Sequence, residues 1–178
     1  LRDGVRLNSG SEAAAVSEHV TARLGGLPSA DLEALGVERR SEGLERGVAA
    51  HHAGLVPIFK EVIEELFAMG LLKIVYATET LALGVNLPAR SVVIDRLTKF
   101  TGQTHEVLTP GQFTQLTGRA GRRGMDTEGH AIVCWSPFVP FDRVASLAGS
   151  TDFVLRSAFR PTYNMVANLI LGRSRAQA

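Results

Sequence analysis

The sequence from Gln115 to Gly124 reads Gln-Leu-Thr-Gly-Arg-Ala-Gly-Arg-Arg-Gly, which places three arginines and three glycines among ten residues. It stands just before an apolar run, Ala131–Trp135, that predicts a buried strand. In a helix, Gln115, Arg119 and Arg122 would fall at i, i+4 and i+7 and would share one face. A planar guanidinium carries a rigid fork of N–H donors that suits phosphate oxygens. The stretch therefore predicts a clamp for a phosphate group, and the alternative is a solvated basic helix face.

The composition is that of an ordinary soluble globular protein. The 178 residues are 45% hydrophobic and 21% charged, enough for one domain with a hydrophobic core. The formal net charge is +1, so any attraction to a polyanion has to come from a local basic patch. The single cysteine, Cys134, lies inside the apolar run and is predicted to be a buried side chain in a reducing compartment. No apolar stretch approaches the roughly 20 residues of a membrane span, and no signal-peptide pattern opens the chain. We therefore predict a cytoplasmic protein without a membrane partner.

From Gly47 onward, strand-like and helix-like segments alternate. β-branched or apolar runs predict the strands, and an amphipathic segment that opens with a proline predicts a helix between the first two. The segments are Gly47–His52, Pro57–Met69, Leu72–Ala77 and Ser91–Asp95. Such alternation predicts an α/β fold with a mainly parallel sheet covered by helices. Ligands of such sheets bind at the carboxyl ends of the strands, where His52, Thr78 and the arginine segment are expected.

The segments on either side of this alternation carry less information. Ala13–Leu24 has apolar residues at helical spacing after Ser9-Gly10-Ser11-Glu12, and Asp31–Leu35 predicts a short helical turn. Thr101–Thr109 predicts a polar loop, and Pro110 opens the helix that is expected to carry the arginines.

Three stretches resemble signature motifs of the superfamily 2 helicases. Gln115–Gly124 resembles motif VI, and Ala77–Ala89, with the sequence Ala-Thr-Glu-Thr-Leu-Ala-Leu-Gly-Val-Asn-Leu-Pro-Ala, resembles motif V. Gly47–Leu55, Gly-Val-Ala-Ala-His-His-Ala-Gly-Leu, resembles the intervening motif of the DExH-box branch that includes the superkiller and exosome-associated RNA helicases. Pro161–Met165 is similar to the passage into the next domain of that branch. The chain is most similar to the bacterial, actinobacterial members.

This resemblance implies the second of two RecA-like domains, a three-layer α/β/α arrangement whose first strand is missing at the N-terminus. Residues 1–137 would form the domain, and residues 138–178 would form a linker and the start of a helical or winged-helix region. The phosphate-binding loop with its lysine and the carboxylates that hold Mg²⁺ belong to the first RecA-like domain, and neither pattern occurs here. We therefore expect a chain that is inactive alone and completes an ATP site with the first domain of the same full-length protein.

For the ATP site, the resemblance implies a set of five residues. Arg122 as first choice and Arg119 as second would be arginine fingers that reach the γ-phosphate. Gln115 would orient the attacking water or couple the cleft to the bound strand. Gly84 would allow close approach and Asn86 would reach the ribose, where many relatives in the superfamily carry Asp.

For contacts with a single nucleic-acid strand, the resemblance implies six residues. They are His52, Ala53, Gly54, Thr78, Glu79 and Arg123. The first three would bind the sugar–phosphate backbone through main-chain groups, and Thr78 at a helix start offers a hydroxyl and N–H groups to a phosphate. The alternative for Thr78 is a helix cap and nothing more. Glu79 would form an ion pair with the arginine segment, and Arg123 would be either a structural or a nucleic-acid contact. The His51-His52 pair does not indicate a metal, because no cysteine or carboxylate stands at ligand spacing.

The expected function is that of the C-terminal motor domain of an ATP-dependent RNA helicase. Its ligands would be ATP, with Mg²⁺ held by the first domain, and single-stranded RNA or DNA. Two alternatives stay open, a DNA helicase of the same branch and a non-catalytic RecA-like module that binds phosphate or nucleic acid. No residue in the sequence tests for a 2′-hydroxyl group.

Overall fold

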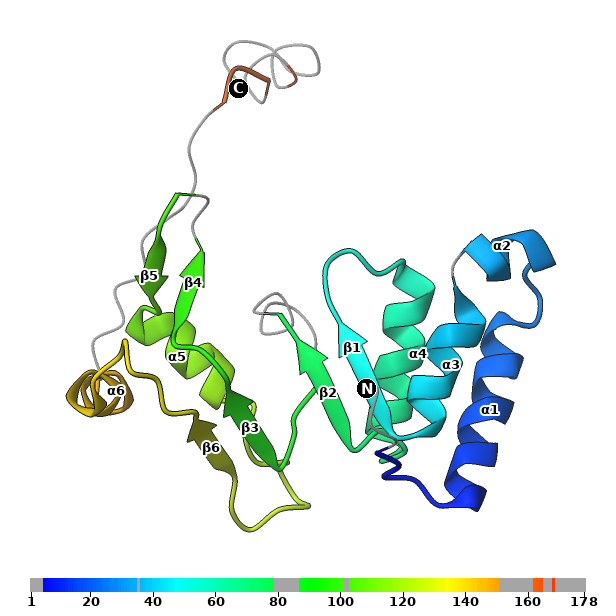
Figure 1. The fold of residues 1–178 in the computed structure, drawn as a ribbon, viewed down its shortest axis with the longest axis horizontal. Helices are drawn as coiled ribbons and strands as arrows, with labels where there is room; N and C mark the ends of the chain where they lie inside the picture. The colour runs from blue at the N-terminus through cyan, green and yellow to red at the C-terminus, as the bar shows by residue number, and fades with distance from the viewer. Residues whose placement is uncertain are drawn as a thin grey trace.

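The computed structural model describes residues 5–34, 36–78, 87–100, 103–150, 162–164 and 168 (Figure 1). The elements in chain order are α1 (Gly10–Leu24), α2 (Ser29–Ala34), α3 (Val37–Glu45), β1 (Val48–His51), α4 (Pro57–Ala68), β2 (Ile74–Ala77), β3 (Ser91–Ile94), β4 (Thr98–Phe100), β5 (His105–Val107), α5 (Pro110–Thr117), β6 (His130–Val133) and α6 (Phe141–Ala148). Strands β1 and β2 form one parallel pair, and β3 and β6 form another. Helices combined with parallel strands confirm the predicted α/β class. None of the helices in these ranges is long and apolar enough to cross a membrane.

Helix α1 begins where the sequence supplies a capping box. The Glu12 backbone N–H donates to the Ser9 hydroxyl at 3.3 Å, and the Ser9 backbone N–H donates to the Glu12 carboxylate at 2.8 Å. Val16, Val20 and Leu24 follow at four-residue spacing, and all three are buried. The helix predicted over Ala13–Leu24 is confirmed and starts earlier, at Gly10.

The N-terminal half has one hydrophobic core, to which α1, α3, α4 and β1 contribute. Helix α4 starts with a proline in its first turn, as predicted, and buries Phe59, Val62, Ile63 and Leu66 along one face. The buried members of this core are Val16, Val20, Leu24, Leu44, Ala49, Leu55, Phe59, Val62, Ile63, Leu66 and Leu72. This packing fixes β1 on α4, and β1 in turn carries the predicted nucleic-acid residues at its carboxyl end.

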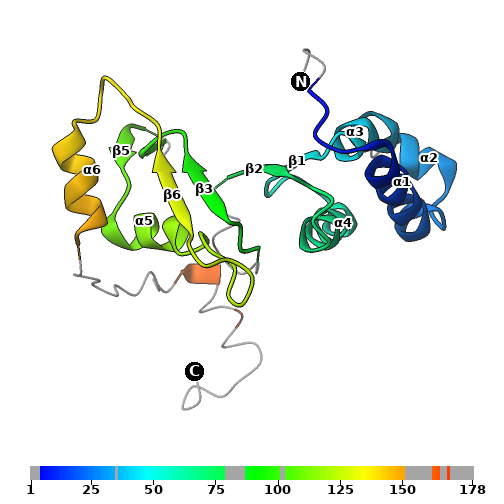
Figure 2. The same ribbon diagram turned by 90° about the horizontal axis from the view of Figure 1, so that it is seen from below.

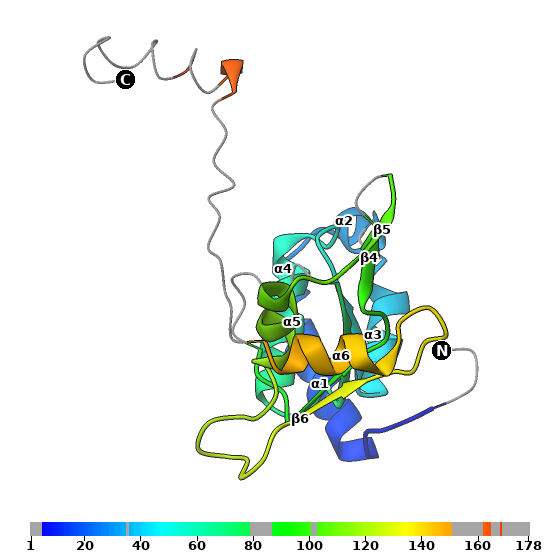
Figure 3. The same ribbon diagram turned by 90° about the vertical axis from the view of Figure 1, so that its left-hand side faces the viewer.

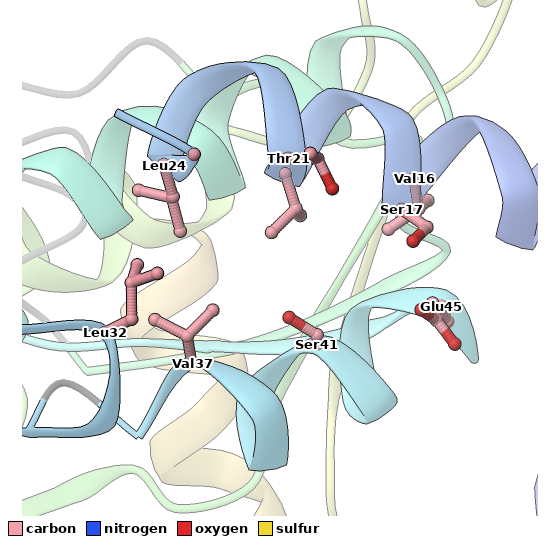
Figure 4. Close-up of a pocket in the computed structure, with 10 residues that line it drawn as sticks. Val16, Ser17, Thr21, Leu24, Leu32, Val37, Ser41 and Glu45 are labelled. Atoms are coloured by element: carbon pink, nitrogen blue, oxygen red, sulfur yellow. The ribbon is translucent and has the colours of Figure 1, made fainter. Parts of the chain in front are cut away.

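The sequence did not predict helix α3, which follows Gly36 at φ 61°. Its residues include Arg39 and Gly43, and only Leu44 is buried, so the apolar repeat that marks an amphipathic helix is missing. A cavity of about 200 Å³ lies between α1 on one side and α2 and α3 on the other, lined in part by Val37 (Figure 4). None of the predicted site residues that the structure describes lines this cavity.

Strands β1 and β2 run parallel, from Val48 opposite Ile74 to His51 opposite Ala77. Gly47, just before β1, has a φ of 85°, and a Cβ there would lie 2.7 Å from a buried side-chain oxygen. A glycine is therefore required where the chain enters β1.

The C-terminal half is built around the β3–β6 pair. Figure 2 shows α5 beneath these two strands, and Figure 3 views the same end of the molecule with α6 in front. The buried members of this second core are Ile94, Leu97, Leu108, Phe113, Val139 and Leu147. Residues beyond 137 therefore contribute to the core, and the domain boundary predicted at that residue stays a prediction.

The polar loop predicted for Thr101–Thr109 is wrong for part of its length, because His105–Val107 forms a strand; Thr101 and Gly102 lie outside the described residues. Strands β4 and β5 form an antiparallel pair there, with Phe100 opposite His105 and their ring centroids 5.3 Å apart. Leu97 and Leu108 flank the pair and are buried in the second core. Each strand has only three residues, which is too short for the alternation of polar and apolar residues to be recognised.

The apolar run Ala131–Trp135 does contain a strand, β6, but the prediction that it is buried is wrong. Ile132 is 50% exposed and Trp135 is 84% exposed. Cys134 is exposed as well, which corrects its prediction as a buried side chain. Val92 and Val133 pack on the second core, whereas the alternate residues of β3 and β6 point to the opposite face. Among the described elements, only one face of this strand pair is covered.

Candidate functional site

Four of the predicted nucleic-acid residues lie at one edge of the β1–β2 pair. The backbone N–H of Thr78 donates to the carbonyl of His51 at 3.3 Å, which continues the parallel pairing beyond the last strand residues. His52, Ala53 and Gly54 leave β1 at this same edge. The expectation that polar residues gather at the carboxyl ends of the strands is met for β1 and β2.

Hydrogen bonds from Leu55 and Lys60 hold the turn at His52–Gly54, and part of the turn is exposed to solvent. The N–H of Leu55 donates to the carbonyl of His52 at 3.1 Å, and the Leu55 side chain is buried. The ammonium of Lys60 on α4 donates to the carbonyl of Ala53 at 3.3 Å. Ala53 and Gly54 are themselves exposed, so their remaining backbone groups face solvent.

His51 is buried, and it anchors the end of β1 to α4. Its Nε2 lies 3.1 Å from the Glu64 carboxylate, while its Nδ1 is buried without a hydrogen-bond partner. No group of three or more His, Cys, Asp or Glu side chains in the described ranges could hold a metal ion. We interpret His51 as a residue that supports the adjacent turn.

The arginine segment does not form one helical face, which corrects the prediction for Gln115, Arg119 and Arg122. Helix α5 starts with a capping box at Thr109 and ends at Thr117, with Gly118 as its C-cap. Only Gln115 belongs to the helix, and it is exposed. The glycine at the end of α5 does not favour continuing the helix, because glycine has a low helix propensity.

After α5 the chain forms a loop, residues 118–126, which we call the arginine loop. It is tied to Ala89, the last residue of the motif V-like stretch. The Ala89 N–H donates to the Arg119 carbonyl at 2.9 Å, and the Gly121 N–H donates to the Ala89 carbonyl at 2.7 Å. Gly121 has a φ of 89°, and a Cβ on Gly129 would lie 2.5 Å from the Gly121 nitrogen. Two distant motifs thus share one backbone junction that tolerates no side chain at Gly129.

Within the arginine loop, Arg122 is bound to a carboxylate that the sequence analysis missed. Its Nε and Nη2 donate to the two Asp126 oxygens at 2.8 Å each, and its backbone N–H donates to Asp126 at 2.9 Å. Hydrogen bonds from Arg122, with a smaller contribution from the charge of Arg90, lower the pKa of Asp126 to about 2. The same pair raises the pKa of Arg122. The only signal in the sequence is an aspartate four residues after an arginine, and outside a helix that spacing predicts no contact by itself.

The other predicted residues are placed as follows. Arg119 is half-buried and is the second residue of the arginine loop, whereas Arg123 is exposed. Glu79, Gly84 and Asn86 lie outside the described residues, and so does most of the stretch that resembles motif V. Their predicted contacts stay predictions.

The parallel strand pairs with their helices are consistent with a RecA-like α/β domain, the class that the family match shows. The chain belongs to the family of the helicase conserved C-terminal domain, whose model matches residues 22–124.

Comparison with curated proteins confirms the predicted branch. The chain is 55% identical to the probable helicase HelY of Mycobacterium tuberculosis, over 96% of its length and 19% of that protein. It is 43% identical to the DExH-box ATP-dependent RNA helicase DExH11 of Arabidopsis thaliana, over 94% of the chain and 12% of the relative. It is 42% identical to the human superkiller complex protein 2, over 92% of the chain and 13% of the relative. The chain thus spans about a fifth or less of the length of these relatives.

Proposed function

We propose that this chain is the C-terminal motor domain of an ATP-dependent RNA helicase. In the full-length protein it would supply arginines to an ATP site shared with the first RecA-like domain, and backbone groups to a bound single strand. The observation that carries the proposal is the junction of the arginine loop with Ala89, which joins the two motifs that resemble helicase motifs V and VI. The family match and the names of the relatives support it.

The arginine loop suits the ATP side of this function. Arg119 and Arg122 carry guanidinium groups on a backbone that the Ala89 junction holds in place. An arginine finger stabilises charge on the transferred phosphoryl group and contributes about 10³ to 10⁵ in rate. Mg²⁺ would accompany ATP, and the first RecA-like domain would hold it.

The β1–β2 edge suits the nucleic-acid side. The turn at His52–Gly54 and the Thr78 N–H and hydroxyl offer main-chain and hydroxyl groups to sugar and phosphate. Contacts of this kind grip a strand without reading its bases, so binding should weaken strongly with salt and show little base preference. Glu79 and Arg123 complete the proposed strand contacts, while Gly84 and Asn86 with Gln115 complete the proposed nucleotide contacts. A cytoplasmic location also stays a prediction.

RNA is favoured over DNA because one relative, DExH11 of Arabidopsis thaliana, is named as an RNA helicase. A DNA helicase of the same branch is the second candidate, and a non-catalytic module that binds phosphate or nucleic acid is the third. Two arginines on a loop tied to a second motif argue for the catalytic candidates, since simple phosphate binding does not require that junction.

The test is unwinding by the full-length protein on matched RNA and DNA duplexes that carry the same 3′ overhang. We expect ATP-dependent unwinding of the RNA duplex, with an Arg122→Ala variant as the inactive control. Faster unwinding of the DNA duplex would select the DNA helicase. Absence of ATP hydrolysis in the full-length protein would select the non-catalytic module.

A further inference from the structure

Asp126 belongs to none of the nucleotide or strand contacts assigned above, yet its carboxylate accepts three hydrogen bonds from Arg122 in the arginine loop. We propose that Asp126 is a positioning residue, which holds the Arg122 guanidinium by one edge and leaves the other edge open for a phosphoryl group. This inference rests on the proposed function, because it assigns a partner to the arginine that the ATP site would use.

The contacts are those of a clamp rather than of a loose surface pair. One Asp126 oxygen accepts from both the Arg122 backbone N–H and Nε, and the other accepts from Nη2. The Asp126 side chain is only 7% exposed, whereas that of Arg122 is 36% exposed. The carboxylate is therefore enclosed, while about a third of the Arg122 side chain is still open to solvent.

The number of N–H donors shows which part of the Arg122 guanidinium remains available for a ligand. A guanidinium has five N–H donors, and Asp126 takes those of Nε and one of Nη2. The other three lie on Nη1 and on the outer side of Nη2, which form the end of the guanidinium plane. A phosphoryl group can accept two of them side by side without displacing Asp126.

The backbone makes the clamp short and stiff. The N–H groups of Met125 and Asp126 both donate to the Arg122 carbonyl at 3.0 Å, and Gly124 turns the chain with a φ of 77°. Asp126 is thus fixed relative to the backbone of the residue whose side chain it holds. A long arginine side chain that would otherwise sample many rotamers is restricted before any ligand binds.

Charge alone would argue against a carboxylate beside a phosphate site, so the gain has to come from orientation. The charge of Arg90 also acts on Asp126. Two guanidinium groups and one carboxylate leave the cluster net positive. Asp126 therefore orients Arg122 without cancelling the attraction for an anion.

The experiment uses the full-length protein with the variants Asp126→Ala, Asp126→Asn, Arg122→Ala and the double variant Asp126→Ala/Arg122→Ala. Asp95→Ala is the matched control, because Asp95 is exposed and its ion pair with Arg96 is long, at 3.7 Å. Three quantities are measured: kcat and KM for ATP at saturating RNA, affinity for ADP with and without aluminium fluoride, and the thermal midpoint.

We expect Asp126→Ala to lower kcat by about 10- to 100-fold with KM nearly unchanged, since a disordered finger still permits ATP binding. Affinity for ADP should persist, and the tightening by aluminium fluoride, which mimics the transferred phosphoryl group, should be lost. Asp126→Asn keeps the size and one acceptor and should fall between wild type and Asp126→Ala. In the Arg122→Ala background, Asp126→Ala should have no further effect on kcat.

Several results would overturn the assignment. If the kcat losses of the two single variants multiply in the double variant, Asp126 acts independently of Arg122. If Asp126→Ala raises kcat, the contact between Asp126 and Arg122 inhibits hydrolysis. If Asp126→Ala weakens the binding of ADP alone and also lowers the thermal midpoint, Asp126 has only a structural role. If the wild-type protein does not hydrolyse ATP, the proposed function itself fails. If the wild type is active but the kcat losses of the two single variants multiply in the double variant, only the role of Asp126 fails.

Discussion

At the scale of single residues, hydrogen bonds tie both candidate finger arginines into the arginine loop. Arg119 is held through its backbone, by the hydrogen bond between its carbonyl and the Ala89 N–H. Arg122 is held through its side chain, by Asp126. The Asp126 carboxylate defines where the Arg122 guanidinium lies, which supports Arg122 as the first choice for the finger.

We therefore predict that Arg122→Ala in the full-length protein lowers kcat for ATP by about 10³-fold, at the low end of the range for arginine fingers. ATP affinity should change little, because the first domain would hold most of the triphosphate. Steady-state hydrolysis with saturating RNA and equilibrium binding of ATP separate the two effects. Arg143→Ala, an exposed arginine on α6, is the control. Unchanged turnover in Arg122→Ala would remove this residue from the role.

A second residue-scale prediction concerns pH and the start of α1. The Lys73 ammonium, at 2.7 Å, and the Ser9 N–H and hydroxyl lower the pKa of Glu12 from 4.5 to about 2. A carboxylate whose pKa is lower in the folded state stabilises the fold above its unfolded pKa, and this contribution is lost as the pH falls through the folded value. The thermal midpoint of Glu12→Gln should thus lie below that of wild type at pH 7, and the gap should close between about pH 4.5 and pH 2. Glu18→Gln, an exposed carboxylate on the same helix, is the comparison, and a gap that persists at pH 2 would contradict the assignment.

At the scale of the elements, local sequence signals predicted some segments well and others poorly. Helices α1 and α4 carry caps, a proline start and regular apolar spacing, so they could be predicted from sequence alone. Helix α3 and the β4–β5 hairpin have few or no buried residues of their own and form through contacts with neighbouring elements. The end of α5 was missed because the arginine spacing was given more weight than Gly118 and Gly121, although glycines near a helix end commonly stop it.

The junction between the arginine loop and β6 yields an element-scale prediction. A methyl group at Gly129 would lie 2.5 Å from the Gly121 nitrogen and 2.6 Å from the Ala120 carbonyl carbon, and backbone atoms cannot move aside as a side chain can. Gly129→Ala should therefore cost about 1–3 kcal/mol in the free energy of unfolding. It should also lower ATP turnover in the full-length protein, by shifting the loop.

Urea unfolding of the chain measures the first effect, and hydrolysis assays on the full-length protein measure the second. Gly111→Ala is the matched control, because no atom lies within 4 Å of its Cβ position in the first turn of α5. That change should be neutral or stabilise the fold by up to about 1 kcal/mol. Equal stability of the two variants would show that the junction tolerates a side chain.

At the scale of the whole molecule, the class and the family followed from the order of the segments and from three motifs. The site followed only in part, since sequence spacing cannot show which backbone groups meet. The Ala89 junction joins residues on either side of the β4–β5 hairpin, and the Asp126 clamp depends on a turn that glycine makes possible. The predicted positions of Gly84 and Asn86 lie outside the described residues.

This chain should not hydrolyse ATP by itself. It carries the arginine loop and the β1–β2 edge, but within the described ranges it has no acidic cluster for a metal ion, and its sequence has no phosphate-binding loop. Positioned arginines stabilise a transition state only when ATP is already held in place. The purified chain should therefore show no RNA-stimulated release of phosphate from ATP, with the full-length protein as the positive control. Hydrolysis by the chain that persists through repeated purification and disappears in Arg122→Ala would show that the ATP site is complete within these residues, and would overturn the proposed division between two domains.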